Sequence, residues 1–294
     1  MTVRFSLLGL AVASIVATCS LALAEAADAP TSDKVGKFAR FKVNDTISFG
    51  IVEGDNVREI SGTIFGEWKK TDKVHALADV TLLVPTRPRH VFGMAGNYKS
   101  HLGDAEIPPK FRIPQPFFKS PSSLLPHEGR IVIPKNSTGE VHFEAEMVVV
   151  IGKPARNVSK AGALDYVLGV TCGNDVSERY WQNDADNKDV QWWRAKGSDT
   201  FGPCGPFVVS GLNYDDLLLT LRLNGEVKQR ERTSRMIHDV ATLVSFISKH
   251  VTLLPGDVIF TGTSGATSKL RPGDVVEVEL QGVGILRNRV VRER

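Results

Sequence analysis

The chain has 294 residues, of which 42% are hydrophobic and 23% charged, and its formal net charge is +3. This is an ordinary globular composition, and the length is sufficient to bury a substantial core. The Lys and Arg residues are scattered, so the sequence predicts neither a nucleic-acid partner nor a basic membrane-binding patch, and a small molecule is the expected ligand.

The N-terminal 24 residues differ from the rest of the chain. Arg4 precedes an apolar run, and the small-residue pattern Ala22-Leu23-Ala24 stands before Glu25, which is typical of a secretory signal cleaved near Ala24. We therefore predict a signal peptide in residues 1–24, a linker in 25–34, and a periplasmic protein without membrane contact after cleavage. The apolar run approaches the ~20 residues that span a bilayer, so an uncleaved membrane anchor is the alternative.

Alternating apolar and polar residues with Asn-Asp and Gly-Asp turns predict a small, strand-rich N-terminal subdomain in residues 35–85. Residues 86–294 contain many short apolar runs separated by Gly, Pro and Asn, which favour a mixed or antiparallel barrel or rolled sheet. The clearest hairpin covers residues 221–227 around Asn224-Gly225. The best helix is 239–251, with Asp239 as its cap. The expected fold class is α+β, mainly β.

The stretch HFEAEMVVVIGK (142–153) contains a strand preceded by two glutamates. Strand side chains alternate between faces, so Glu144 and Glu146 project to the same side. If that side is buried, the two carboxylates need protonation or a cation, and oxygen ligands favour Mg²⁺, Mn²⁺ or Ca²⁺. An edge strand with its polar face in water is the alternative.

A third carboxylate, Asp175, stands where an apolar strand runs into a polar, helical segment. Asp at such a junction is often a helix cap. Arg179 and Gln182 follow four and seven residues later, which predicts that all three lie on one helical face and favours a site.

Three further candidates lie in loops rich in Gly and Pro. His101 is followed by Asp104 and Glu106, either of which could orient its imidazole. Lys196 precedes a run of small residues, and Thr263 follows an apolar strand, where a hydroxyl could hold a carboxylate. Each of these residues taken singly is also compatible with an ordinary loop.

Two cysteines remain after removal of the signal, Cys172 and Cys204. An oxidising compartment could join them in a disulfide. Their apolar surroundings are equally compatible with two buried thiols.

Seven motifs in order resemble the fumarylacetoacetate hydrolase family: GNYKSH, FFKSPSSLL, HFEAEMVVVIGK, GVTCGNDVSERYWQ, QWWRAKGSDTFGPCGP, FTGT and LRPGDVVEVEL. The resemblance runs from Lys37 to the C-terminus. It implies a mixed β-roll or β-sandwich fold, a catalytic domain in residues 86–294 and a homodimer. It also implies the shorter, three-carboxylate type of site, in which Glu144, Glu146 and Asp175 bind Mg²⁺ or Mn²⁺.

The resemblance further implies roles for residues around the metal. His101 would be the general base that activates water, Lys196 would stabilise developing negative charge, and the substrate would meet Arg179, Gln182, Thr263 and Lys119. Two positions depart from the family pattern, and both are close in sequence to residues expected to act on or bind the substrate. Asp104 stands where short members often carry glutamate, and Ser264-Gly265 replaces a usual proline.

The function implied is metal-dependent hydrolysis of a C–C bond in an acylpyruvate or diketo acid, through an enolate stabilised by the metal. A decarboxylase or isomerase of 2-hydroxy-dienoate or oxaloacetate type, or a ureidoglycolate-type lyase, uses related chemistry and is the alternative. An alternative of another class is a protein that binds a metal or carboxylate without turnover.

Overall fold

The computed structural model describes residues 35–103 and 106–294. The predicted signal peptide, the linker and Asp104 lie outside the described residues. Within the described ranges, no helix is both long and apolar enough to cross a bilayer.

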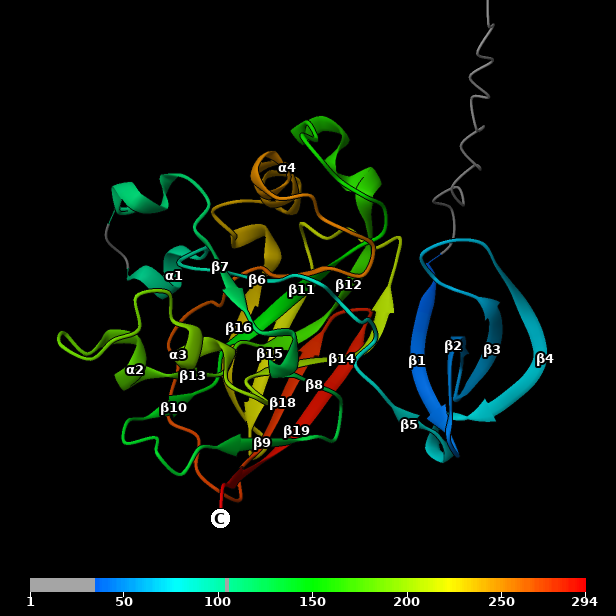
Figure 1. Cartoon of the computed structure of the whole chain (residues 1–294), viewed down its shortest axis with the longest axis horizontal. Coiled ribbons are helices and arrows are strands. Elements are labelled where there is room, and N and C mark those ends of the chain that lie inside the picture. The colour runs from blue at the N-terminus through cyan, green and yellow to red at the C-terminus, as the bar shows by residue number, and fades with distance from the viewer. Residues whose placement is uncertain (1–34, 104–105) are drawn as a thin grey trace, which may run out of the picture. The chain divides into compact units, whose positions relative to one another are not determined.

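Strands dominate the described residues, as predicted (Figure 1). They are β1 (Lys37–Val43), β2 (Thr46–Glu53), β3 (Asn56–Gly62), β4 (Trp68–Ala76), β5 (Thr81–Leu82), β6 (Val91–Met94), β7 (Pro116–Lys119), β8 (Leu124–Leu125), β9 (Arg130–Ile133), β10 (Val141–His142), β11 (Ala145–Ile151), β12 (Val167–Asn174), β13 (Ser177–Glu178), β14 (Gly202–Val209), β15 (Leu218–Leu223), β16 (Glu226–Arg232), β17 (Val258–Phe260), β18 (Val275–Leu280) and β19 (Gly284–Arg292). The α-helices are α1 (Lys99–Leu102), α2 (Arg179–Asn183), α3 (Trp193–Gly197) and α4 (Val240–His250). Short 3-10 helices occupy Leu77–Asp79, Pro109–Arg112, Pro121–Ser123, Lys160–Tyr166 and Thr233–Arg235.

The larger sheet is mixed and runs in the order β4-β3-β2-β1-β14-β12-β11-β17-β6-β7, with β5 beside β1 and β8 beside β14. Most neighbours are antiparallel, whereas β17 pairs with β6, and β14 with β8, in parallel. The N-terminal strands continue this sheet, because Lys37 of β1 pairs with Val209 of β14.

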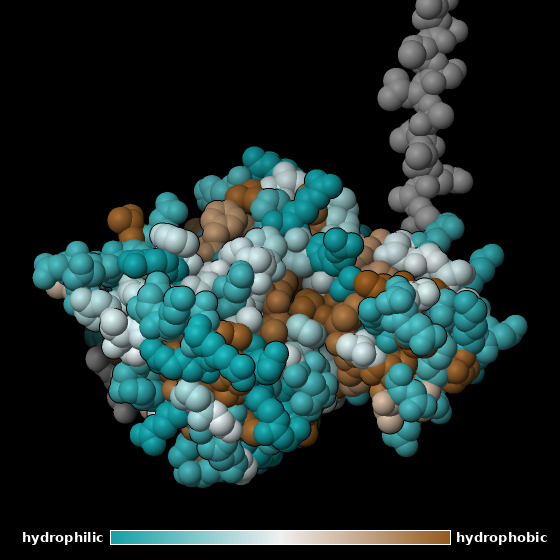
Figure 2. Space-filling model, turned by 60° about the horizontal axis from the view of Figure 1, so that its bottom comes forward, coloured by the Kyte–Doolittle hydropathy of each residue, from teal (hydrophilic) through white to brown (hydrophobic). Residues whose placement is uncertain are grey.

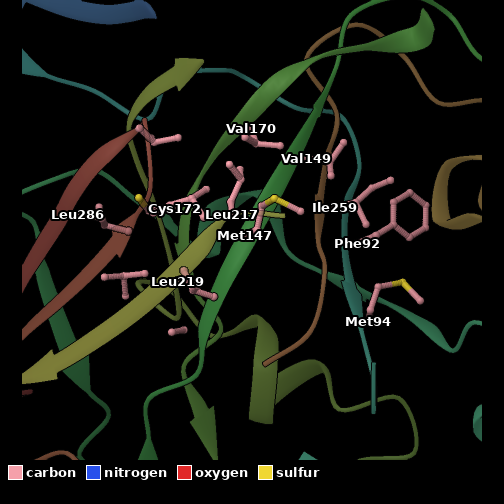
Figure 3. Close-up of a cluster of buried hydrophobic side chains, with 14 of the residues drawn as sticks. Phe92, Met94, Met147, Val149, Val170, Cys172, Leu217, Leu219, Ile259 and Leu286 are labelled. Atoms are coloured by element: carbon pink, nitrogen blue, oxygen red, sulfur yellow. The ribbon is translucent and has the colours of Figure 1, made fainter. Parts of the chain in front are cut away.

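A second sheet has the order β16-β15-β18-β19-β9, and its side chains meet those of the larger sheet in one hydrophobic cluster. Figure 3 shows Met147 and Val149 of β11 in this cluster with Leu219 of β15 and Leu286 of β19. Burial of each such side chain contributes about 1.5–3 kcal/mol. The site described below therefore rests on two sheets that pack against each other.

Strand β11 is buried on both faces, which explains its unbroken apolar run. Met147 and Val149 face the cluster between the sheets, whereas Val148 and Val150 belong to a second cluster on the other face. By the same alternation Glu146 is on the side of Val148. The edge-strand alternative is wrong for this segment, because β11 has β12 and β17 as partners.

Two local predictions are confirmed. Helix α4 begins after Asp239, whose carboxylate accepts a hydrogen bond from Thr242 N at 2.7 Å. Strands β15 and β16 form the hairpin, and both turn residues, Asn224 and Gly225, have positive φ, 55° and 84°. Such a turn matches the twist of the two strands.

Cys172 and Cys204 are free thiols, so the disulfide alternative is wrong. Cys172 lies opposite Gly205, and Cys204 opposite Gly173, in the β12–β14 pair. The two thiols therefore project from opposite faces of the sheet, and they belong to different hydrophobic clusters. Burial raises the pKa of Cys172 to about 12 and also raises that of Cys204.

Hydrophilic residues cover most of the face shown in Figure 2, and hydrophobic residues gather in separate groups. Among the described residues with large exposed apolar side chains are Trp193 of α3, at 68%, and Val190 before it, at 98%. Scattered apolar exposure of this kind is normal in globular proteins.

Candidate metal centre and active site

Three buried carboxylates converge because β11 and β12 are adjacent antiparallel strands. Ala145, at the start of β11, lies opposite Asn174, at the end of β12. This register places Glu144 and Glu146 beside Asp175, whose N–H donates to the Glu144 carbonyl at 2.9 Å. One oxygen of each carboxylate lies within 4.8 Å of the others, and the three residues are at most 4% exposed.

Cationic side chains compensate two of these carboxylates. Lys196 Nζ of α3 lies 2.7 Å from both Glu144 Oε2 and Asp175 Oδ2. Arg179 Nη2 of α2 donates to Glu144 Oε1 at 2.7 Å, and Lys119 Nζ of β7 donates to Asp175 Oδ1 at 2.6 Å. A buried charge without such a partner would cost several kcal/mol.

Glu146 has no cation at hydrogen-bonding distance in the described structure. Its Oε2 accepts from Gly262 N at 2.6 Å, and its buried Oε1 has no hydrogen-bond partner among the described residues. Burial and the negative charges of Asp175 and Glu144 raise the pKa of Glu146 well above its usual range.

These residues fit a hard divalent cation. Three carboxylates supply oxygen ligands of the kind that Mg²⁺ and Mn²⁺ prefer, and Glu146 Oε1 is an acceptor to which no described residue donates. A carboxylate has about four lone-pair positions, so Glu144 and Asp175 can accept from Lys196 and still serve as ligands.

The electrostatics of the centre keep Lys196 cationic. Burial by itself would lower the pKa of Lys196, but the carboxylates of Asp175 and Glu144 outweigh burial and raise it. Burial would raise the pKa of Glu144, yet Lys196, Arg179 and His101 lower it to about 2. The pair is therefore ionised at neutral pH.

Lys119 differs from the other candidates in facing only protein groups. Its ammonium donates to Asp175, to the Lys196 carbonyl and, at 3.2 Å, to the Phe201 carbonyl. Its side chain is fully buried, and burial lowers its pKa. With three acceptors for three N–H groups, Lys119 has no donor left for a substrate.

His101 lies on α1, and its ring is fixed by a loop that follows β17. Its Nδ1 is 2.8 Å from the Gly265 carbonyl, which can only accept, so Nδ1 must donate and Nε2 keeps its lone pair in the neutral ring. Gly265 N in turn donates to Ser100 Oγ at 3.1 Å. His101 is close enough to Glu144 to lower the pKa of that carboxyl.

The acidic partner expected for His101 is not found within the described residues. Glu106 is exposed, and Asp104 belongs to the part of the chain that is not described. The observed partner of Nδ1 is the Gly265 carbonyl.

Arg179 and Gln182 lie near the carboxylates, but the secondary structure that brings them there differs from the predicted helix. Asp175 precedes β13 and is not helical, and α2 begins only at Arg179, with Glu178 as its cap. The predicted single helical face is therefore wrong, because the chain forms a short bridge with β10 first. Arg179 Nη1 nevertheless donates to Gln182 Oε1 at 2.6 Å.

Thr263 is buried beside the centre, and its hydroxyl accepts from Gln229 Nε2 at 2.9 Å. Sequence reasoning missed both Gln229 and Gly265. Gln229 is the only residue of β16 that is buried. The other residues of β16 are mostly charged, so the local sequence does not indicate that this glutamine is buried.

Figure 1 shows α1, α2 and α3 on the same side of the sheets. These three short helices carry His101, Arg179 with Gln182, and Lys196, respectively. Arg179 and Lys196 bond to the carboxylates, and His101 is close enough to Glu144 to affect the pKa of that carboxyl. One side of the molecule therefore combines an imidazole, a cationic lysine and a candidate metal centre.

Comparisons with known proteins identify relatives of the chain. The model for the fumarylacetoacetate (FAA) hydrolase C-terminal region matches residues 90–291, and the Rv2993c-like N-terminal model matches residues 37–85. A structure of 5-carboxymethyl-2-hydroxymuconate delta-isomerase from Mycobacterium smegmatis is 38% identical with a TM-score of 0.80, covering 87% of this chain and all of that one.

Two curated relatives represent other reactions. The 2,4-didehydro-3-deoxy-L-rhamnonate hydrolase of Sphingomonas sp. (strain SKA58) is 34% identical over 277 residues, 86% of this chain and 95% of that protein. The 4-hydroxyphenylacetate degradation bifunctional isomerase/decarboxylase of Salmonella dublin is 39% identical over 207 residues, 69% of this chain and 47% of that protein. The relatives thus include hydrolases, isomerases and decarboxylases, and the chain belongs to the fumarylacetoacetate hydrolase family.

Proposed function

We propose that the protein is a divalent-metal-dependent hydrolase that cleaves a C–C bond in an acylpyruvate or diketo acid. The observation that carries this proposal is the buried Glu146 Oε1 beside Glu144 and Asp175, which has no hydrogen-bond partner among the described residues. His101 is close enough to Glu144 to lower the pKa of that carboxyl. Glu144, Glu146 and Asp175 would hold Mg²⁺ or Mn²⁺, with Ca²⁺ as a further possibility. The cation, when bound, would polarise a substrate oxo group and offset negative charge that develops there.

The protein's own groups would carry the proton and orient the substrate. His101 accepts a proton from water at Nε2, because Nδ1 is already committed to the Gly265 carbonyl. The water oxygen would bond to the substrate carbonyl carbon as its C–C bond breaks, and the imidazolium would return the proton to the carbon that leaves. Lys196 stays cationic and stabilises negative charge on the leaving part of the substrate.

Arg179, Gln182 and Thr263 are the proposed contacts to the substrate carboxylate. Arg179 is partly exposed at 18% and is held by Glu144 and by Thr267 Oγ1 at 2.9 Å. We assign Lys119 to the support of Asp175 instead of to the substrate, because its donors are already engaged.

An isomerase or decarboxylase acting on 2-hydroxy-dienoates or oxaloacetate is the second candidate, supported by the isomerase and decarboxylase relatives. A ureidoglycolate-type lyase and a binding protein without turnover are further alternatives. Stabilisation of negative charge next to an oxo group would serve all the catalytic versions.

One experiment separates these possibilities. Enzyme reconstituted with Mg²⁺ or Mn²⁺ is incubated with diketo acids, oxaloacetate and hydroxy-dienoates, with EDTA controls, and the products are identified. Two acids from one diketo acid support the hydrolase, whereas CO₂ or a shifted double bond supports the alternatives. If His101→Ala abolishes turnover and leaves the metal content unchanged, the binding-only alternative is excluded.

We also propose that the protein is exported to the periplasm and forms a homodimer. The pattern of residues 1–24 motivates the first proposal and the family the second. Mass spectrometry of the mature N-terminus and cell fractionation test export. Protein that keeps residues 1–24 and is found in the membrane fraction would contradict the proposal. Light scattering of purified protein tests the dimer.

A further inference from the structure

We infer that Gln229 is a positioning residue that holds the candidate metal-ligand strand and the loop of Thr263 to Gly265 in one arrangement. The catalytic importance of Gln229 rests on the proposed function, whereas its positioning role is inferred from hydrogen bonds of the described residues. Gln229 is 4% exposed, whereas Val227 in the same strand is 48% exposed. Strand β16 thus has an amide at its single buried position, which is costly unless the amide is hydrogen-bonded.

The Gln229 amide bonds to two segments that are far apart in sequence. Its Oε1 accepts from Ala145 N at 2.9 Å. Its Nε2 donates to Thr263 Oγ1 at 2.9 Å and to the Ser264 carbonyl at 2.5 Å. Because a backbone N–H can only donate and a carbonyl can only accept, the orientation of the amide is fixed.

Both segments lead directly to the candidate site. Ala145 stands between Glu144 and Glu146. On the loop side, Gly262 N donates to Glu146 Oε2, and the Gly265 carbonyl accepts from His101 Nδ1. Gln229 therefore connects the carboxylates with the residue that sets the proton position on His101.

The bond to Thr263 also sets the direction of its hydroxyl. Since Oγ1 accepts from Gln229, the Thr263 proton is free to donate elsewhere, including to a substrate oxygen. A residue that accepted from Thr263 would remove this donor. Gln229→Glu makes this change at constant shape, because a carboxylate keeps an acceptor for Ala145 N but loses both donors.

The test compares Gln229→Glu and Gln229→Met with wild type and with Gln281→Glu. Gln281 is exposed in the turn after β18, a strand of the same sheet as β16, and its Oε1 accepts from Leu218 N at 3.1 Å. Gln281→Glu is therefore the same chemical change at a residue whose side chain bonds to no described residue of the site. Three properties are measured: Mn²⁺ affinity, the ¹⁵N signals of His101 assigned with His101→Ala, and kcat and KM on a substrate of the wild type.

We expect Gln229→Glu to raise KM and lower kcat, together by on the order of 10²-fold in kcat/KM. The His101 signal should lose its single Nδ1–H form. Gln229→Met, which also loses the bond to Ala145, should in addition weaken Mn²⁺ binding by roughly 10–100-fold. Gln281→Glu should resemble wild type in all three measurements.

The proposal is overturned if Gln229→Glu lowers only the melting temperature and leaves all three properties like those of Gln281→Glu, since a purely structural amide predicts that result. If no substrate is found, the proposed function fails, but the Mn²⁺ and His101 measurements still decide the role of Gln229. If neither Gln229 variant folds, Thr263→Val removes one acceptor, and an unchanged His101 signal would then count against the proposal.

Discussion

Among the three carboxylates of the candidate metal centre, Glu146 is the one without a cationic partner in the described structure. Its folded-state pKa lies well above its usual range. Its contribution to stability is therefore complete below the usual carboxyl range and is lost as the pH rises through the folded-state pKa. A metal-free protein at neutral pH must either keep a proton on Glu146 or bear a buried charge.

We expect metal-free Glu146→Gln to be more stable than metal-free wild type at neutral pH, by on the order of 1 kcal/mol or more, because the amide replaces a buried carboxyl that would otherwise tend to ionise. This advantage should disappear below the usual carboxyl range. Urea unfolding in EDTA at the two pH values measures it. Glu53→Gln is the control, and it should lower stability at neutral pH, because Lys70 and Arg58 lower the pKa of Glu53. Lower stability of metal-free Glu146→Gln at neutral pH would contradict the account.

Lys196 provides a second prediction at the residue scale. Lys196→Met leaves Glu144 and Asp175 buried with one cation fewer, and we expect a loss of about 3–5 kcal/mol in the free energy of unfolding. Lys70 Nζ is also 2.7 Å from a carboxylate, that of Glu53, but its side chain is 54% exposed. Lys70→Met should therefore change stability little. Equal losses in the two variants, measured by chemical unfolding, would contradict the role of burial.

At the scale of elements, α4 depends on its cap as well as on its apolar face. Asp239 Oδ1 accepts from both Thr242 N and Thr242 Oγ1, and Leu243, Val244 and Ile247 are buried. We expect Asp239→Ala to cost about 1 kcal/mol, whereas Asp239→Asn keeps an acceptor and should cost less. Thermal unfolding of wild type and both variants measures these differences. A melting temperature of Asp239→Ala equal to that of wild type would show that the cap contributes nothing.

At the scale of the whole molecule, the candidate centre exists only when β11 and β12 are paired, so an unfolded chain cannot form it. A cation that binds the folded form alone stabilises it by about 2.7 kcal/mol at a concentration 100 times its Kd. We expect the melting temperature to rise with Mn²⁺ concentration and to return to its starting value in EDTA. Glu146→Gln should show a much smaller rise, and a wild-type melting temperature independent of Mn²⁺ would argue against the centre.

Local patterns in the sequence were sufficient for several features. The 3.6-residue period and Asp239 predict α4, and Asn224-Gly225 predicts the β15–β16 turn, because both depend on neighbours in the chain. The alternation of β11 likewise predicts that Glu146 shares a side with Val148. Asp175 was identified as a candidate, but its helical setting was wrong, since pairing of β13 with β10 replaces the first turns of the expected helix.

The sequence by itself determined the mainly β class, the hairpin, the capped helix and the paired glutamates, because each follows from periodicity or turn chemistry within a few residues. Only the tertiary structure decided that Lys119 faces Asp175 and that Gln229 joins Ala145 to Thr263. It also decided that Gly265 holds His101 and that the two thiols face apart. These contacts join residues far apart in the chain, and they depend on strand order and register, which no local period encodes.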